Sequence, residues 1–474
     1  MEALLKHHPK ALPFLFFTEM WERFGFYVVQ GLLVLYLTKH FNFSDEASDT
    51  ISGVFAGLVY ISPFIGGFLA DRILGFKTAV FWGGFFLILG YALLAFSSSQ
   101  LLIYPALGTI IVGNGMFKPN ISSLLGTQYA NDEFRRDAGF TLFYIGINLG
   151  AILSGFSGYI RNAFGWQVTF GLASMGIILG LMIFYSGLRY IKDTQKLPPV
   201  SRSFSYQLPL YCLLVIIGLN FLLRIESLAN WLLPIAGVVL LVFLVVLTLQ
   251  QTPEYRKCLL VLNTLIVSSI IFWALFLQLF ISANLFVDRL VDKTLFGIPL
   301  TTTIFYASES VFILLLGPLF AWSWNVLGRY QKNPSPINKF VLGIFMAGLG
   351  FVVLSASTLF PNSQGLISPL WVFLAYFFLT IGELLISPIG LSAVTLLAPS
   401  QLVGMMMGIW FAATGFGGLL AGMIAKMAAV PETVTTTAGK LAIYQNAFLN
   451  FAYLAFIVAI ILFFVQVGLK KLLR

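Results

Sequence analysis

The chain has 474 residues, of which 59% are hydrophobic and only 9% are charged, and its mean hydropathy is +0.93. A soluble domain averages about 25% charged residues. The composition therefore excludes a soluble protein with a single membrane anchor and predicts an all-α polytopic membrane protein.

Long apolar segments recur along the whole chain, and each can cross the hydrocarbon core of a bilayer as a helix. The first follows a short basic start and is too long for a signal-peptide core, so we expect it to remain as a span. In chain order, fourteen transmembrane helices are predicted at 12–38, 49–70, 77–98, 101–122, 136–160, 166–188, 208–224, 230–249, 259–281, 303–324, 338–359, 368–388, 403–425 and 445–469.

The basic residues between these spans are unevenly distributed. With both termini in the cytoplasm, most of the 27 Lys and Arg residues fall in the inner loops and tails. Cytoplasmic loops of membrane proteins carry this excess. The formal charge of +9 is therefore explained by topology, and we expect the lipid bilayer, and not a nucleic acid, as the partner.

The order of the spans suggests three parts. The first six and the last six spans could form two six-helix bundles, with the pair at 208–249 between them. That pair carries only Arg224 and Glu226, in its outer turn, and no charge within either helix, which is typical of an inserted hairpin that faces lipid. The predicted division is an N-terminal bundle at 1–190, a linker with the transmembrane hairpin at 191–257, and a C-terminal bundle at 258–474.

A few ionisable residues lie inside the predicted spans. Each charged group at the centre of a membrane helix costs about 2.5–3.5 kcal/mol. Such residues must pair with one another, face a wet cavity or carry protons, and all three indicate transport. These candidate proton-coupling residues are Glu19, Glu22, Arg23, Lys118, Glu309 and Glu383.

The first span concentrates three of these charges. Spacings of three and four place Glu19, Arg23, Tyr27 and Gln30 on one stripe of the helix, with Glu22 beside it. Two carboxylates and an arginine in a low-dielectric setting can share or exchange a proton. A purely structural salt bridge is the alternative, although it would not need two acids and a tyrosine on one path.

The run at 18–27 resembles the first-helix E-x-x-E-R-F-x-Y-Y signature of the proton-dependent oligopeptide transporter family. The segment at 143–150 is similar to the family's F-Y-x-x-I-N-x-G, and 115–120, 272–275 and 382–388 also resemble family segments. These matches occur in order over nearly the whole chain. The extra hairpin resembles the bacterial branch of the family.

The resemblance implies a major facilitator fold that alternates access around a central site. It implies a symporter of the bacterial cytoplasmic (inner) membrane that couples inward proton flow to uptake of di- and tripeptides. The expected partners are a small peptide and protons. We expect no cofactor and a monomer.

The resemblance also implies roles for individual residues. Arg23 and Lys118 would hold the peptide carboxylate, with Glu19 and Glu22 as their proton-linked partners. Lys118 and Glu383 would form the salt bridge that closes the inner side. The positions that match the lining of the family's substrate pocket are Tyr27, Tyr60, Asn148, Trp273, Ser387 and Trp410.

Three positions depart from the family pattern. Gln30 stands where a second arginine is usual, and Leu277 where a glutamate is usual, so both members of one expected charge pair are missing. Glu309 stands where an asparagine usually contacts the peptide amine. It could face the outer loop as a solvated residue, or face the cavity as the amine acceptor or a relocated proton site. The alternative substrate is another small zwitterion or an anion.

The sequence does not contain the residues that other functional classes require. The sequence shows no nucleophile–His–acid set, and His7, His8 and His40 lie outside the predicted spans, so we expect no enzyme. Cys212 and Cys258 lack metal-ligand spacing and are expected to be buried thiols, with no metal site. A receptor without transport would need a sizeable soluble domain, and the spans leave no room for one.

Overall fold

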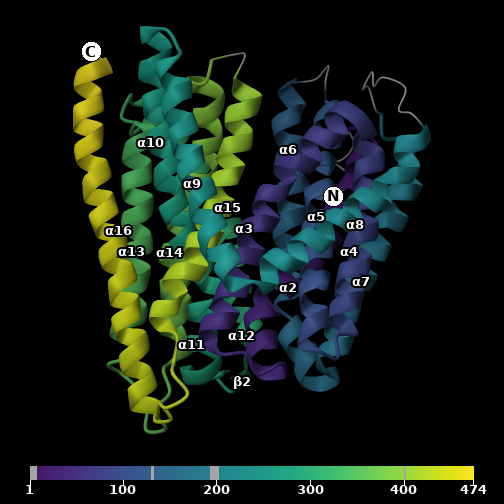
Figure 1. Cartoon of the computed structure of the whole chain (residues 1–474). Helices are drawn as coiled ribbons and strands as arrows, with labels where there is room; N and C mark the ends of the chain where they lie inside the picture. Colours follow the sequence, from purple (N-terminus) through teal and green to yellow (C-terminus); the bar gives the residue numbers. More distant parts are fainter. Residues whose placement is uncertain (1–7, 130–132, 193–201, 400–401, 474) are drawn as a thin grey trace. The chain divides into compact units, whose positions relative to one another are not determined.

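The computed structural model describes residues 8–129, 133–192, 202–399 and 402–473. In this part of the chain the secondary structure is almost entirely helical (Figure 1). The one sheet among these residues is a short antiparallel hairpin of β1 (Thr294–Leu295) and β2 (Ile298–Pro299). The predicted all-α class is therefore confirmed.

Long helices make up most of the described residues. Their apolar composition favours helices, because a helix satisfies its own backbone hydrogen bonds inside a membrane. They are α2 (Leu12–His40), α3 (Asp45–Leu69), α4 (Phe76–Ala95), α5 (Gln100–Gln128), α6 (Glu133–Ser154), α7 (Ser157–Gly187), α8 (Arg202–Arg224), α9 (Glu226–Leu249), α10 (Pro253–Phe276), α12 (Thr302–Arg329), α13 (Pro336–Ser357), α14 (Pro369–Leu397), α15 (Val403–Ala425) and α16 (Thr437–Leu473).

Each of the fourteen predicted spans overlaps one of these helices. Among the described residues, 11 segments are long and apolar enough to cross a membrane by length and composition alone. Helix α2 is not among them because it carries the charged residues of the first span, and α6 and α9 have shorter apolar stretches. The sequence therefore predicts the polytopic architecture, and the predicted spans include α2, which hydropathy alone does not identify.

The boundaries differ from prediction around α6 and α7. The predicted span 136–160 runs beyond Ser154, where α6 ends, and α7 starts at Ser157, before the predicted position 166. Gly165 interrupts the helical path of α7 with φ 82° and ψ −178°. The backbone conformation at Gly165 favours glycine, and the predicted span coincides with the part of α7 beyond this kink.

The region between the predicted spans 259–281 and 303–324 is also structured. Between α10 and α12 the chain forms a 3-10 turn, η2 (Leu277–Phe280), then the short helix α11 (Ser282–Leu290) and the β1–β2 hairpin. Nearly all residues of α11 are buried. The sequence did not predict α11, because its residues are not strongly apolar. Their burial comes from packing and ion pairs.

The described helices group into two units. Unit 1 comprises Met1–Tyr36 and Leu58–Glu226, and unit 2 comprises Leu37–Gly57 and Ser227–Arg474. The segment 37–57 therefore belongs to unit 2, although the chain on both sides of it belongs to unit 1. Helices α8 and α9 are likewise assigned to different units. The division of the chain at 190 and 257 stays a prediction.

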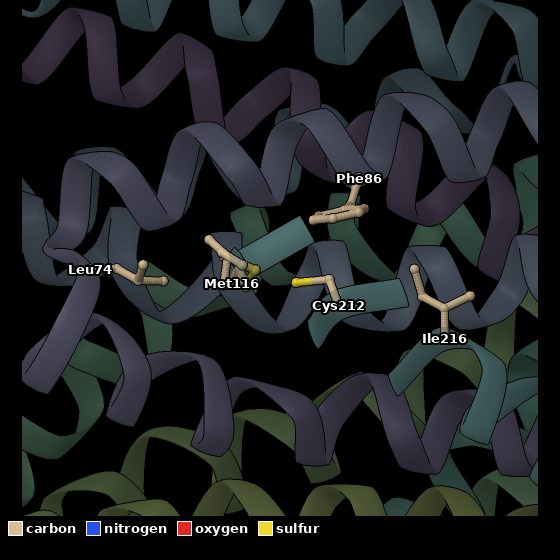
Figure 2. Packing of buried hydrophobic residues seen from close by; sticks show 6 residues of the cluster. Leu74, Phe86, Met116, Cys212 and Ile216 are labelled. Carbon is tan, nitrogen blue, oxygen red and sulfur yellow. The ribbon is translucent and has the colours of Figure 1, made fainter. Parts of the chain in front are cut away.

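Inside unit 1, α8 is attached to α4 and α5 by an apolar cluster. Figure 2 shows Cys212 of α8 beside Met116 of α5, in a cluster with Leu74, Phe86 and Ile216. Cys212 is a buried free thiol, as expected, whereas Cys258 is a free thiol that is only half-buried. In unit 2, α12 and α14 pack through the stacked rings of Phe305 and Phe373, whose centroids are 4.9 Å apart.

Candidate substrate and proton site

The charged residues of α2 form a compact group in the interior of unit 1. Glu19 and Glu22 are each 0% exposed and Arg23 is 4% exposed. Both oxygens of Glu22 accept hydrogen bonds from the Arg23 guanidinium, with Nη2 2.5 Å from Oε1. Nε of Arg23 also lies 3.6 Å from Oε1 of Glu19. The guanidinium therefore lies between two carboxylates of its own helix.

Helix α5 adds a second cation and an amide to this group. The ammonium of Lys118 donates to Oε1 of Glu19, which joins α5 to α2. Asn114, one turn earlier on α5, accepts a hydrogen bond of 3.0 Å from Nη2 of Arg23 and donates one of 2.8 Å to the carbonyl oxygen of Val59. Our sequence reasoning missed Asn114. Its spacing of four residues from Lys118 is the signal that could have identified it.

The four ionisable groups balance in charge, but they differ in access. Two acids face two cations, so the group is neutral when all four are ionised. The Lys118 side chain is 27% exposed, whereas the side chains of Glu19 and Arg23 are at most 5% exposed. Oε2 of Glu19 has no hydrogen-bond partner among the described residues. Lys118 is therefore the most exposed member of the group, and Glu19 uses only one of its two oxygens in the contacts within it.

Helix α6 approaches this group closely through glycine. A Cβ at Gly150 would lie 2.9 Å from the amide nitrogen of Phe24 and 3.0 Å from Cβ of Arg23. Two residues earlier on α6, Asn148 is 3% exposed and donates 2.9 Å to the carbonyl oxygen of Tyr144. The glycine of the 143–150 motif thus permits the close packing of α6 beside Arg23, whereas the asparagine is hydrogen-bonded within its own helix.

Aromatic rings form the next layer of the site in unit 1. The guanidinium of Arg23 lies 4.4 Å from the centroid of the Phe26 ring, at cation–π distance. Tyr27 and Tyr60 each meet the same ring edge-on, with centroids at 5.4 and 6.1 Å. The predicted residues Arg23, Tyr27 and Tyr60 are thus assembled around Phe26, which our sequence analysis did not single out.

Gln30 lies further along the stripe of α2. It is 5% exposed, and neither atom of its amide has a hydrogen-bond partner among the described residues. In unit 2, Leu277 is 2% exposed, and the neighbouring Gln278 donates 2.9 Å to the carbonyl oxygen of Ala421 on α15. Neither Gln30 nor Leu277 brings a charge to its unit.

The two predicted acids of unit 2 contact each other. Glu309 on α12 is 7% exposed, and its Oε2 accepts a hydrogen bond of 3.0 Å from the Ser310 hydroxyl. The carboxyl group of Glu383 on α14, which is half-buried, lies close enough to interact with it, and Oε2 of Glu383 has no hydrogen-bond partner among the described residues. Two carboxylates at close range repel each other, and a shared proton removes that repulsion. No basic side chain in the described part of the chain forms an ion pair with either acid.

The remaining predicted residues of unit 2 lie on three helices. Trp273 on α10 is half-buried, and its Nε1 has no hydrogen-bond partner among the described residues. Ser387 is half-buried one turn after Glu383 on α14. Trp410 on α15 is 3% exposed and packs on Phe340, with ring centroids 6.1 Å apart. Their roles as pocket-lining residues stay predictions.

The expected salt bridge between Lys118 and Glu383 joins residues of different units. Within its own unit, Lys118 pairs with Glu19, and Glu383 pairs with Glu309. The bridge stays a prediction.

Long apolar helices that enclose buried, hydrogen-bonded charges define the chain as a polytopic membrane transporter. Comparison with solved structures agrees. The chain is 30% identical to the peptide transporter POT in its crystal structure with sulfate, with a TM-score of 0.85, and the match covers 98% of this chain and 96% of that one. Tetrameric PepTSo2 is 28% identical with a TM-score of 0.85, over 97% of this chain and 98% of the other.

The sequence comparisons place the chain more narrowly. The model of the POT family matches residues 77–443. The dipeptide and tripeptide permease A of Yersinia pestis is 34% identical over 96% of this chain and 91% of the permease. The dipeptide and tripeptide permease B of Aliivibrio fischeri is 34% identical over 98% of this chain and 96% of the permease. The chain belongs to the POT family of transporters, as the resemblance in the sequence indicated, and has their major facilitator fold.

Proposed function

We propose that the chain is a proton-coupled symporter that imports di- and tripeptides by alternating access. The observation that carries the proposal is the chain of contacts Glu22–Arg23–Glu19–Lys118 between α2 and α5. Two findings support the proposal. The relatives are named dipeptide and tripeptide permeases, and the solved peptide transporter was crystallised in complex with sulfate, which is an anion.

The geometry suggests how a proton and a peptide enter together. A peptide carboxylate that binds Lys118 or Arg23 competes with Glu19 and Glu22 for the same cations. An acid that loses its cation in a buried setting is costly to keep ionised. It takes a proton, and the site remains neutral. The substrate therefore brings its own negative charge, and the acid it displaces binds the proton that drives uptake.

The carboxyl pair of unit 2 is the proposed acceptor of the peptide amine. With one proton shared between Glu309 and Glu383, the pair keeps one negative charge, which complements a single ammonium group. Because the usual asparagine is replaced by Glu309, and because Gln30 and Leu277 are uncharged, a different small zwitterion is the second candidate substrate. The pair itself favours substrates with a free amine.

The family and the membrane spans indicate where in the cell the chain acts and how it is oriented. The chain is a multi-pass membrane protein of a family with bacterial permeases. We place it in the bacterial inner membrane with both termini in the cytoplasm, because the basic loops predict that orientation. A monomer that binds only peptide and protons is sufficient for this cycle, although PepTSo2 was crystallised as a tetramer. The proposed cycle uses neither a cofactor nor catalysis.

Uptake into proteoliposomes tests the proposal. One charge that crosses 100 mV is worth about 2.3 kcal/mol, so one proton per peptide sustains about fifty-fold accumulation. Labelled dipeptide should accumulate under an imposed inward proton gradient, and a protonophore should abolish the accumulation. Uptake against a gradient that ignores both the protonophore and the pH would contradict proton coupling. Uptake of other zwitterions but not of peptides would favour the second candidate.

A further inference from the structure

The first turns of α3 bury a polar face within unit 2. Asp45, Ser48, Asp49 and Ser52 recur at spacings of three and four, and each is at most 8% exposed. The adjacent Gly53 allows α3 to meet α15, since a Cβ at Gly53 would lie only 2.6 Å from the amide nitrogen of Gly422. The glycines permit a close contact between α3 and α15, in which a Cβ at Gly422 would lie 2.8 Å from the carbonyl oxygen of Asp49.

Two ion pairs hold the segment 37–57 in this position. Arg289 of α11 donates from Nη1 and Nη2 to the two oxygens of Asp45, at 2.6 and 2.7 Å. The amide of Val430 also donates 2.9 Å to Asp45. Lys39, at the end of α2, lies 2.6 Å from a carboxylate oxygen of Asp288. The carboxylate of Asp45 is therefore fully paired, and α11 is the element to which the segment is anchored.

Asp49, one turn after Asp45, forms no ion pair in the described part of the chain. Its side chain is 1% exposed, and its Oδ1 has no hydrogen-bond partner among the described residues. The hydroxyl groups of Ser48 and Ser52 also lack partners there. The charged and titratable groups that act on Asp49 from the surrounding elements are Asp45 and Glu46 of α3, Arg289 of α11, Lys426 after α15 and Tyr444 of α16.

Two of the charged groups, Arg289 and Lys426, are cations and two, Asp45 and Glu46, are acids, so when ionised they bring no net positive charge to Asp49. Arg289 already donates two hydrogen bonds to Asp45 and a third, of 3.4 Å, to the Tyr444 hydroxyl. An ionised carboxylate that is buried without a partner strongly opposes the packing around it. A neutral Asp49 avoids this cost in the docked arrangement.

We propose that Asp49 is a proton-binding site that controls the docking of segment 37–57 onto α11 and α15. The docked segment requires Asp49 to carry a proton, and the undocked segment exposes the carboxyl group to water and releases the proton. In the predicted topology this end of the molecule faces outside. An external proton on Asp49 therefore permits closure of the outer end.

This inference adds a second proton site to the proposed function and rests on it for the physiological role only. The site is separate from Glu19, Glu22, Glu309 and Glu383. The docking equilibrium itself is independent of substrate. Because docking takes up a single proton in this proposal, the equilibrium constant of docking changes by at most about tenfold per pH unit.

Cysteine accessibility in the purified, membrane-reconstituted protein tests the proposal. In a background with Cys212→Ser and Cys258→Ser, a Ser52→Cys thiol is buried while the segment is docked. The exposed neighbour Glu46→Cys, in the same background, reports how maleimide reactivity itself varies with pH. The labelling of Ser52→Cys relative to Glu46→Cys should rise with external pH, by up to about tenfold per unit. Adding Asp49→Asn should keep the ratio low at every pH.

The matched control is Glu46→Gln, which removes an acid from the same turn at an exposed position. Combined with Ser52→Cys, it should leave the ratio dependent on pH, because Asp49 itself is retained. A ratio that does not vary with pH, or that varies equally with Asp49→Asn, overturns the proposal. Hydrogen–deuterium exchange of residues 45–57 in the unmodified protein at two pH values gives the same test without a substitution. A pH-dependent ratio in a protein whose uptake ignores proton gradients would refute the proposed function but retain the Asp49 site.

Discussion

Lys118 of α5 forms an ion pair with Glu19 of α2 through the same carboxylate oxygen that lies 3.6 Å from Arg23. One oxygen therefore serves two cations from two helices. Any event that draws one cation away changes the electrostatic setting of the other. This shared oxygen is the structural reason to expect that substrate binding and proton binding are coupled in unit 1.

Replacing the lysine tests this relationship. Lys118→Ala should abolish uptake driven by a proton gradient. It should also lower stability by about 1–3 kcal/mol, because Glu19 loses a hydrogen bond but retains Arg23 nearby. The double variant Glu19→Gln/Lys118→Ala removes both partners and should recover most of the stability without recovering uptake. Thermal unfolding in detergent and proteoliposome uptake measure the two effects. A double variant no more stable than Lys118→Ala would contradict the assignment.

The carboxylate of the substrate is assigned to Arg23 together with Lys118. Arg23→Lys cannot reproduce the forked contact with Glu22 and the bond to Asn114. The apparent affinity for peptides with a free C-terminus should fall about tenfold, equivalent to ~1.4 kcal/mol. Competition against a labelled dipeptide measures this, and Asn114→Ala should have a smaller effect. Equal competition by amidated and free peptides in the unmodified protein would show that the carboxylate is bound elsewhere.

The acid pair of unit 2 is expected to select for an amine. The double variant Glu309→Gln/Glu383→Gln preserves the shape of both side chains, but it removes the single negative charge that the pair keeps. Uptake of dipeptides with a free amine should fall about tenfold or more, whereas N-acetylated analogues should be affected much less. Ser310→Ala retains both carboxyl groups and is the control. Equal losses for both substrate classes would assign the pair to proton relay, and no loss would make Glu309 a bystander.

The contact between α2 and α6 is expected to tolerate no side chain. Gly150→Ala should destabilise the protein by about 1–3 kcal/mol, because the added methyl group overlaps the backbone beside Arg23. Uptake should fall as Arg23 is displaced. Gly171→Ala is the matched control, since nothing lies within 4 Å of a Cβ at that helical glycine. Thermal unfolding of the two variants side by side measures the difference, and equal stability would exclude a packing role for Gly150.

The sequence by itself determined the class of the protein. Fourteen apolar segments predict the helices because a membrane leaves a backbone few other ways to satisfy its hydrogen bonds. The residues of the first span were identifiable because buried charge is costly and therefore rare. Even α2, whose charges lower its hydropathy, was predicted from the length of the apolar run around them. The helix boundaries near Gly165 were predicted less well, because a kink does not change the hydropathy of an apolar segment.

Only the tertiary structure decided which groups act together. Asn114 joins Arg23, and Glu309 meets Glu383, because helices distant in sequence pack side by side, and no local pattern encodes those pairings. The same holds for Asp49. At the start of an amphipathic helix, an aspartate is expected to be solvated. It becomes a candidate proton site only because α3 is packed against α15 and because Arg289 is already occupied by Asp45. The cost of a buried charge depends on its partners, and partners are set by packing.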